Sequence, residues 1–132
     1  MGARILIIED NPANMELIRC LLEARGHRVI AAETGEAGLR LADAERPDLI
    51  LCDIQLPGMD GTAVSRRLKQ SPDLKQVPVL AVTAFAMKGD RERILGAGFD
   101  GYFSKPIEPE TFAADVERFL QNQVPAPAGP PD

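Results

Sequence analysis

Short apolar runs recur along the chain at near-regular intervals. Four of them are continuous rather than alternating and lie at residues 5–8, 29–32, 49–52 and 79–82, and a shorter pair follows at 102–103. Continuous apolar runs are typical of strands that are covered on both faces, as in a parallel sheet. We therefore predict parallel strands at residues 4–8, 28–32, 48–52, 78–82 and 100–103.

Between these runs the apolar residues follow a helical spacing. The clearest example begins at Phe112 and continues at i+4, i+7 and i+8, which places all of these side chains on one face of a helix. Asn11, Thr34 and Asp60 stand just before three such segments, and short polar side chains of this kind cap helix starts. The predicted helices span residues 12–25, 35–45, 61–70, 87–96 and 108–120.

The alternation of strands and helices indicates an α/β fold, a doubly wound five-stranded parallel sheet. Right-handed crossovers then place helices on both faces of that sheet. A length of 132 residues fits one domain, which we assign to residues 1–121. Residues 122–132 are rich in proline and alanine and offer little to bury, so we expect a disordered tail or a linker there.

Composition and charge narrow the function classes. A net charge of −5 argues against direct nucleic-acid binding, because nucleic-acid binders carry a basic face. The apolar runs are too short for a secretion signal or a membrane span, so no membrane insertion is expected. Cys20 and Cys52 are far apart and lack metal-ligand spacing. A reducing compartment suits such a chain, and we expect a cytoplasmic protein.

Polar residues gather where the predicted strands end. Glu9 and Asp10 follow the first strand, Asp53 the third, Thr83 the fourth and Lys105 the fifth. The carboxyl ends of parallel strands meet at one edge of the sheet, where ligands bind in folds of this kind. We therefore expect three carboxylates, one hydroxyl and one amine to share a crevice.

Three neighbouring carboxylates repel one another unless a cation or raised pKa values relieve them. Two such charges about 4 Å apart cost about 4 kcal/mol at an effective dielectric constant near 20. Mg²⁺ is the natural partner, because it takes carboxylate oxygens, waters and phosphate. A carboxylate beside the metal is then suited to attack phosphorus, with the metal screening the incoming charge.

Four stretches of the chain resemble the receiver domains of two-component response regulators, which are CheY-like proteins. They read Ile-Glu-Asp-Asn at 8–11, Cys-Asp-Ile-Gln-Leu-Pro-Gly-Met-Asp-Gly at 52–61, Val-Thr-Ala-Phe-Ala-Met at 82–87 and Ser-Lys-Pro at 104–106. The resemblance extends from residue 3 to about residue 120. It implies a flavodoxin-like (βα)5 fold with the strand order 2-1-3-4-5.

The resemblance also implies a metal site and a phosphoacceptor. Asp53 would accept the phosphoryl group. Asp10, Asp53 and the backbone carbonyl of Gln55 would bind Mg²⁺ directly, with Mn²⁺ as a substitute. Glu9 would act through a water molecule or hold the metal's ligand shell, because its side chain is longer than the aspartate that many family members carry at this position.

Further roles follow from the same resemblance. Thr83 and Lys105 would bind the phosphoryl oxygens, and a cis peptide between Lys105 and Pro106 would aim the amine. Thr83 would move toward the phosphoryl group, and Tyr102 would turn inward to fill the space behind it. Two residues would border the path of the hydrolytic water and tune the phosphate lifetime: Gln55 and Phe85.

The implied function is that of a signalling phosphoacceptor rather than an enzyme, one that catalyses only its own phosphorylation and autodephosphorylation. A histidine kinase or a histidine phosphotransfer protein would donate the phosphoryl group. A downstream protein would read the surface formed by the predicted segments 87–96, 100–103 and 108–120. The chain would be a monomer or a weak dimer that depends on phosphorylation.

Three other functions agree less well with the sequence. A receiver-like module that signals without phosphorylation has no need of Asp53, Thr83 and Lys105 together. A phosphohydrolase with an aspartyl nucleophile usually carries an Asp-x-Asp pattern on its first strand, whereas this strand ends in Glu9 and Asp10. A flavodoxin needs a phosphate-binding loop after the first strand, and the sequence has none there.

Overall fold

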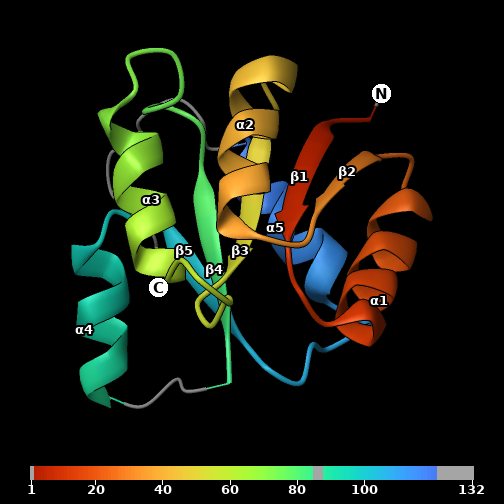
Figure 1. Ribbon diagram of the computed structural model, residues 1–132. Helices are drawn as coiled ribbons and strands as arrows, with labels where there is room; N and C mark the ends of the chain where they lie inside the picture. Colours follow the sequence, from red (N-terminus) through yellow and green to blue (C-terminus); the bar gives the residue numbers. More distant parts are fainter. Residues whose placement is uncertain (1, 85–87, 122–132) are drawn as a thin grey trace.

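Strands and helices alternate along residues 2–84 and 88–121, the part of the chain that the computed structural model describes. The strands are β1 Arg4–Ile8, β2 Arg28–Ala32, β3 Leu49–Asp53, β4 Val79–Thr83 and β5 Gly101–Ser104. The helices are α1 Pro12–Glu23, α2 Gly35–Glu45, α3 Gly61–Gln70, α4 Lys88–Gly96 and α5 Phe112–Gln121. The strands are parallel and lie in the order β2-β1-β3-β4-β5 (Figure 1). The predicted fold class and strand order are confirmed.

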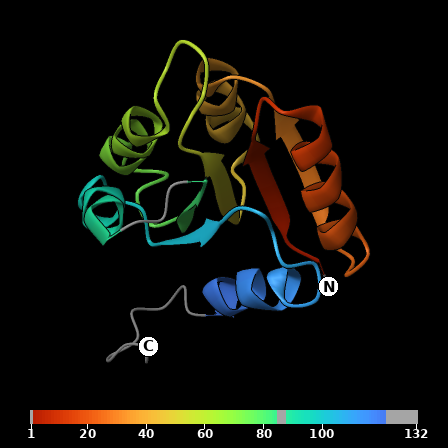
Figure 2. The same cartoon turned by 90° about the horizontal axis from the view of Figure 1, so that it is seen from below.

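Apolar side chains cover both faces of the sheet. Helices α2, α3 and α4 pack on one face, where Val64 and Ile94 enter the core, and α1 and α5 pack on the other through Ile18 and Val116 (Figure 2). Successive strand residues alternate between the two layers. Every residue of β3 and β4 is buried, which explains why the apolar runs in the sequence are continuous.

Short polar side chains cap three helices as the sequence predicts. The side chain of Asn11 accepts the N–H of Asn14 at the start of α1. Thr34 does the same for Ala37 in α2, and Asp60 for Thr62 in α3. Each cap satisfies an N–H group that has no partner within its helix.

Several predicted boundaries were wrong by a few residues. Strands β3, β4 and β5 each begin and end one residue later than predicted, so Asp53 is the last residue of its strand rather than the residue after it. Helix α1 ends at Glu23, because a tight turn with Gly26 at φ 88° follows. Helix α5 begins at Phe112 because the Glu108 carbonyl accepts the N–H groups of residues 111 and 112 and closes a turn first.

Two predictions fall outside the described residues, namely the tail at 122–132 and the role of Phe85. Within residues 2–84 and 88–121, every helix is too short or too polar to cross a membrane.

Candidate functional site

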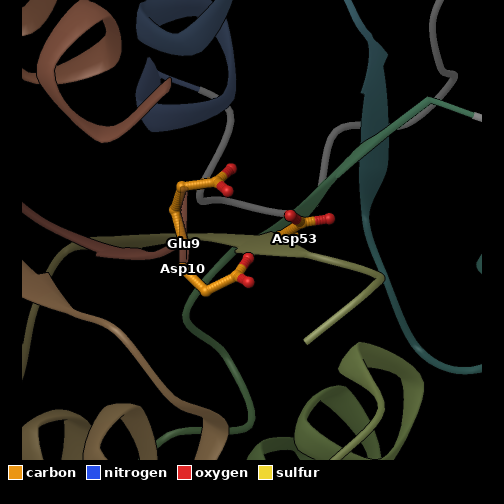
Figure 3. Close-up of side chains that lie close together, drawn as sticks. All are labelled: Glu9, Asp10 and Asp53. Atoms are coloured by element: carbon orange, nitrogen blue, oxygen red, sulfur yellow. The ribbon is translucent and has the colours of Figure 1, made fainter. Parts of the chain in front are cut away.

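The carboxyl edge of the sheet brings distant parts of the chain together. Strands β1 and β3 are neighbours, and Ile8 pairs with Cys52. Glu9 and Asp10 therefore leave β1 beside Asp53, the last residue of β3 (Figure 3). The strand order places these two strands side by side and so brings their strand-end carboxylates together, at the place for which we keep the name crevice.

Three carboxylates cluster in this crevice. One oxygen from each of Glu9, Asp10 and Asp53 lies within 4.8 Å of the other two. Glu9 and Asp53 are 2% and 4% exposed, whereas Asp10 is open to solvent. Two buried carboxylates and one exposed carboxylate thus form a cluster of negative charge at this edge of the sheet.

Lys105 is the cation of the crevice. Its Nζ donates to Oδ2 of Asp53 at 3.1 Å and lies 3.5 Å from Oε1 of Glu9. The backbone N–H of Lys105 donates to the carbonyl of Thr83 at 2.8 Å, which ties the residue after β5 to the end of β4. The peptide bond between Lys105 and Pro106 is cis. The amine thus lies against both buried carboxylates.

Backbone N–H groups hold one oxygen of each buried carboxylate. The N–H of Gln55 donates to Oδ1 of Asp53 at 3.0 Å, and the N–H of Asn11 donates to Oε2 of Glu9 at 3.0 Å. Oε1 of Glu9 is buried and accepts no hydrogen bond within the described part of the chain. The carboxylates are therefore fixed in direction, and one of them keeps an oxygen with unused acceptor capacity.

The pKa of Glu9 is raised from 4.5 to about 7. Burial is the main cause, because a low-dielectric environment disfavours the charged form. The charge of Asp53 and a hydrogen bond to it raise the pKa further, while the N–H of Asn11 and the charge of Lys105 lower it. Among the described residues, the cluster thus combines three carboxylates with the amine of Lys105, and ionisation of Glu9 is opposed mainly by its burial.

This pKa predicts a pH-dependent stability of the metal-free protein. Between pH 4.5 and about 7 the folded chain keeps a proton on Glu9 that the unfolded chain has released, so the free energy of unfolding falls as pH rises. The full effect is on the order of 3 kcal/mol. Urea unfolding in EDTA across this range, for wild type and Glu9→Gln, measures the contribution as the difference between the two curves.

Saturating Mg²⁺ provides the control for this measurement, because a nearby cation favours ionised Glu9 and should flatten the wild-type curve. Parallel curves for wild type and Glu9→Gln in EDTA would show that Glu9 titrates at the same pH in both states.

The other predicted residues that the structure describes lie in different environments. Thr83 ends β4 and is 2% exposed. Tyr102 is half-buried, pairs in register with Ala81 and packs against the core layer under α2, α3 and α4. Thr83 lies on the same sheet face as Ala81, two residues along the strand. Gln55 is exposed directly beyond Asp53.

Sequence reasoning gave no role to two residues near the end of β3. Gly61 begins α3 against the end of β3, where a Cβ would overlap the carbonyl oxygen of Asp53 and lie 2.7 Å from Cα of Ile54. Arg93 of α4 lines a hollow of about 330 Å³ together with Gln55 and Asp60. The Asp-Gly pair at 60–61 was a signal for the first, whereas nothing in the sequence pointed to Arg93.

The residues of the crevice fit a divalent metal ion. Three carboxylates supply the hard oxygen ligands that Mg²⁺ prefers, and Oε1 of buried Glu9 has no hydrogen-bond donor within the described residues. A cation at this place would relieve the repulsion that contributes to the raised pKa of Glu9. The arrangement suits capture of a phosphoryl group by Asp53 with Lys105 beside it.

The family model and the related sequences indicate the same protein family. The family described as response regulator receiver domain matches residues 5–117. The chain is 48% identical over 120 residues to the polar-differentiation response regulator DivK of Brucella anthropi, covering 91% of this chain and 98% of that protein.

Solved structures agree with this result. The receiver domain of a sensor histidine kinase from Pseudomonas aeruginosa PAO1 is 37% identical, with a TM-score of 0.80 over 93% of this chain and 98% of that one. Its structure has a magnesium ion coordinated in the active site cleft. The signal receiver domain of a signal transduction histidine kinase from Syntrophus aciditrophicus is 33% identical, with a TM-score of 0.85 over 98% of both chains.

Proposed function

Because the chain belongs to the response regulator receiver domain family, we propose that Asp53 accepts a phosphoryl group in a Mg²⁺-dependent reaction. Members of this family are signalling phosphoacceptors of two-component systems. The observation that carries the proposal is the buried carboxylate of Asp53, which clusters with Glu9 and Asp10 and accepts a hydrogen bond from the amine of Lys105. A histidine kinase or a histidine phosphotransfer protein is the donor.

In this proposal the residues of the crevice have different roles in metal binding. Asp10, Asp53 and the backbone carbonyl of Gln55 would bind Mg²⁺ directly, and Glu9 would act through a water molecule or hold the ligand shell. When bound, the ion neutralises negative charge on the acceptor and on the incoming phosphoryl oxygens. Mn²⁺ prefers similar oxygen ligands and serves as a substitute.

Phosphoryl transfer at this site exchanges one bond to phosphorus for another. An oxygen of Asp53 forms a bond to phosphorus while the bond between phosphorus and the donor's histidine nitrogen breaks, and the nitrogen keeps that electron pair. Lys105 holds a phosphoryl oxygen by charge and hydrogen bonding, and the hydroxyl of Thr83 donates to another. In autodephosphorylation a water oxygen forms a bond to phosphorus while the bond between phosphorus and Asp53 breaks, which restores the carboxylate and releases inorganic phosphate. Gln55 and Phe85 tune the rate of this step.

Phosphorylation adds a charge of about −1.5 to −2 at Asp53. We propose that Thr83 then moves toward the phosphoryl group and that Tyr102 turns inward, which biases an equilibrium between two shapes. A downstream protein reads the surface of α4, β5 and α5, where Leu95 is 43% exposed. The chain acts as a monomer or a weak phosphorylation-dependent dimer, without direct nucleic-acid contact or membrane insertion.

The proposed receiver domain spans residues 1–121, and the segment 122–132 lies outside the described residues. We place the activity in the cytoplasm. Both cysteines, Cys20 and Cys52, are free thiols, as in proteins of reducing compartments.

Acetyl phosphate with Mg²⁺ tests the proposal in one experiment. Intact mass should increase by one phosphoryl group, and the fluorescence of Tyr102 should change in parallel, whereas EDTA should prevent both. Tyr102 is a clean probe because the chain has one tyrosine and no tryptophan. Thr83→Ala should retain the mass increase and lose most of the fluorescence change.

Two results would contradict the proposal. Wild type that gains no mass under these conditions would favour a module that works without phosphorylation. Multiple turnovers of a generic phosphomonoester such as p-nitrophenyl phosphate would favour a phosphohydrolase.

A further inference from the structure

A polar junction joins three segments at the amino edge of the sheet, away from the carboxylate crevice. Glu117 of α5 accepts a hydrogen bond from Nε of Arg25 at 3.1 Å, and its second oxygen pairs with Nη2 of the same guanidinium. Nε2 of His27 lies 2.7 Å from Oε2 of Glu117. The N–H of Ala3 donates to Nδ1 of His27 at 3.0 Å. One carboxylate thus connects α5 with the α1–β2 turn and, through the imidazole, with the start of β1.

The hydrogen bonds determine the tautomer of His27. Because the N–H of Ala3 is a donor, Nδ1 must be unprotonated, so the neutral ring carries its proton on Nε2 and donates it to Glu117. The imidazole is 7% exposed, which leaves little access for water to replace either partner. Arg25, followed by His27, holds the pKa of Glu117 at about 2, so this carboxylate stays charged.

The same helix contacts the strand that carries Tyr102. Two residues beyond Glu117, Phe119 packs so closely on Gly101 that a Cβ there would lie 2.5 Å from Cζ of the ring. Gly101 begins β5 and Tyr102 follows directly. A shift of α5 would therefore change the contact between the ring of Phe119 and the backbone of Gly101, the residue before Tyr102.

An open hollow lies beside the junction and borders the last turn of α5. It measures about 400 Å³ and is lined by Arg25, His27 and Glu117 together with Leu120 and Asp48. Close packing resists helix displacement elsewhere in a core, whereas the last turns of α5 border open space here. The polar contacts of Glu117 thus act together with the apolar packing of Phe119 and Leu120 in holding this end of the helix.

We propose that Glu117 is a conformational latch, which sets the position of α5 and so links the α1–β2 turn to Tyr102. The mechanical link stands on the geometry alone, while its regulatory meaning rests on the proposed function, in which Tyr102 and α5 form part of the output surface. A protein that pulls Arg25 or His27 away from Glu117 would alter that surface without phosphorylation of Asp53.

Hydrogen exchange of the full, unphosphorylated chain tests the latch. Glu117→Gln replaces one acceptor oxygen by an NH₂ group that faces the donors of Arg25 or His27. The amides of Ala3 and Arg28 should then exchange roughly tenfold faster, as expected when a hydrogen bond to a charged group is lost. The fluorescence of Tyr102 should also change.

Asp115→Asn is the matched control. It removes one carboxylate from the same helix, but Asp115 pairs with Arg118 within α5, so both readouts should stay at the wild-type value. Should Glu117→Gln fold poorly, Arg25→Met keeps the carboxylate and removes one partner, and a smaller change in the same direction is expected.

Faster exchange confined to α5, with Ala3, Arg28 and Tyr102 as in wild type, would overturn the latch. These readouts need no phosphoryl group, so they remain informative even if Asp53 accepts none.

Discussion

Asp53→Asn should abolish incorporation of a phosphoryl group from acetyl phosphate at every Mg²⁺ concentration. An amide is a far weaker nucleophile than a carboxylate, and the substitution also removes a proposed metal ligand and the partner of Lys105 at 3.1 Å. Loss of a nucleophile typically lowers the rate by roughly 10³-fold or more. Intact mass after incubation with acetyl phosphate and Mg²⁺ measures the effect directly.

Asp60→Asn is the control for this variant. Asp60 is a nearby aspartate that caps α3 by accepting the N–H of Thr62, and asparagine caps helices about as well as aspartate. The Asp60 variant should therefore fold and gain the same mass as wild type. A phosphoryl group that still appears on the Asp53 variant would move the acceptor to another residue and refute the central assignment.

Gly61→Ala should destabilise the chain by about 3 kcal/mol, in the upper range for overpacking a dense site. The added Cβ would overlap the carbonyl oxygen of Asp53 and lie 2.7 Å from Cα of Ile54. Both neighbours are backbone atoms, so relief requires the end of β3 and the start of α3 to separate. Urea unfolding gives the stability, and the same acetyl phosphate assay should show slower acceptance because the Asp53 backbone shifts.

Gly96→Ala is the matched substitution at a site with space. Gly96 ends α4, and a Cβ there would meet no atom within 4 Å, while alanine favours the helix by up to about 1 kcal/mol. This variant should be as stable as wild type or more stable. Equal stability of the two glycine variants would mean that the contact between Gly61 and Asp53 is looser than its geometry indicates.

Local patterns in the sequence were enough to predict the strands and helices and most of the residues that meet in the crevice. Continuous apolar runs required strands buried on both faces, and the cap residues Asn11, Thr34 and Asp60 marked helix starts by chemistry that acts over three residues. Because the carboxyl ends of parallel strands share one edge, Glu9, Asp53 and their neighbours were expected to meet. The strand order itself came from family resemblance.

Only the tertiary structure decided what depends on contacts between distant segments. The raised pKa of Glu9 requires its burial beside Asp53, and spacing along the chain does not reveal burial. Gly61 matters because two backbone segments approach closely, and the junction of His27 with Glu117 joins residues 90 positions apart. Periodicity records which face of an element is buried, but the neighbours of a side chain are set by how the elements pack.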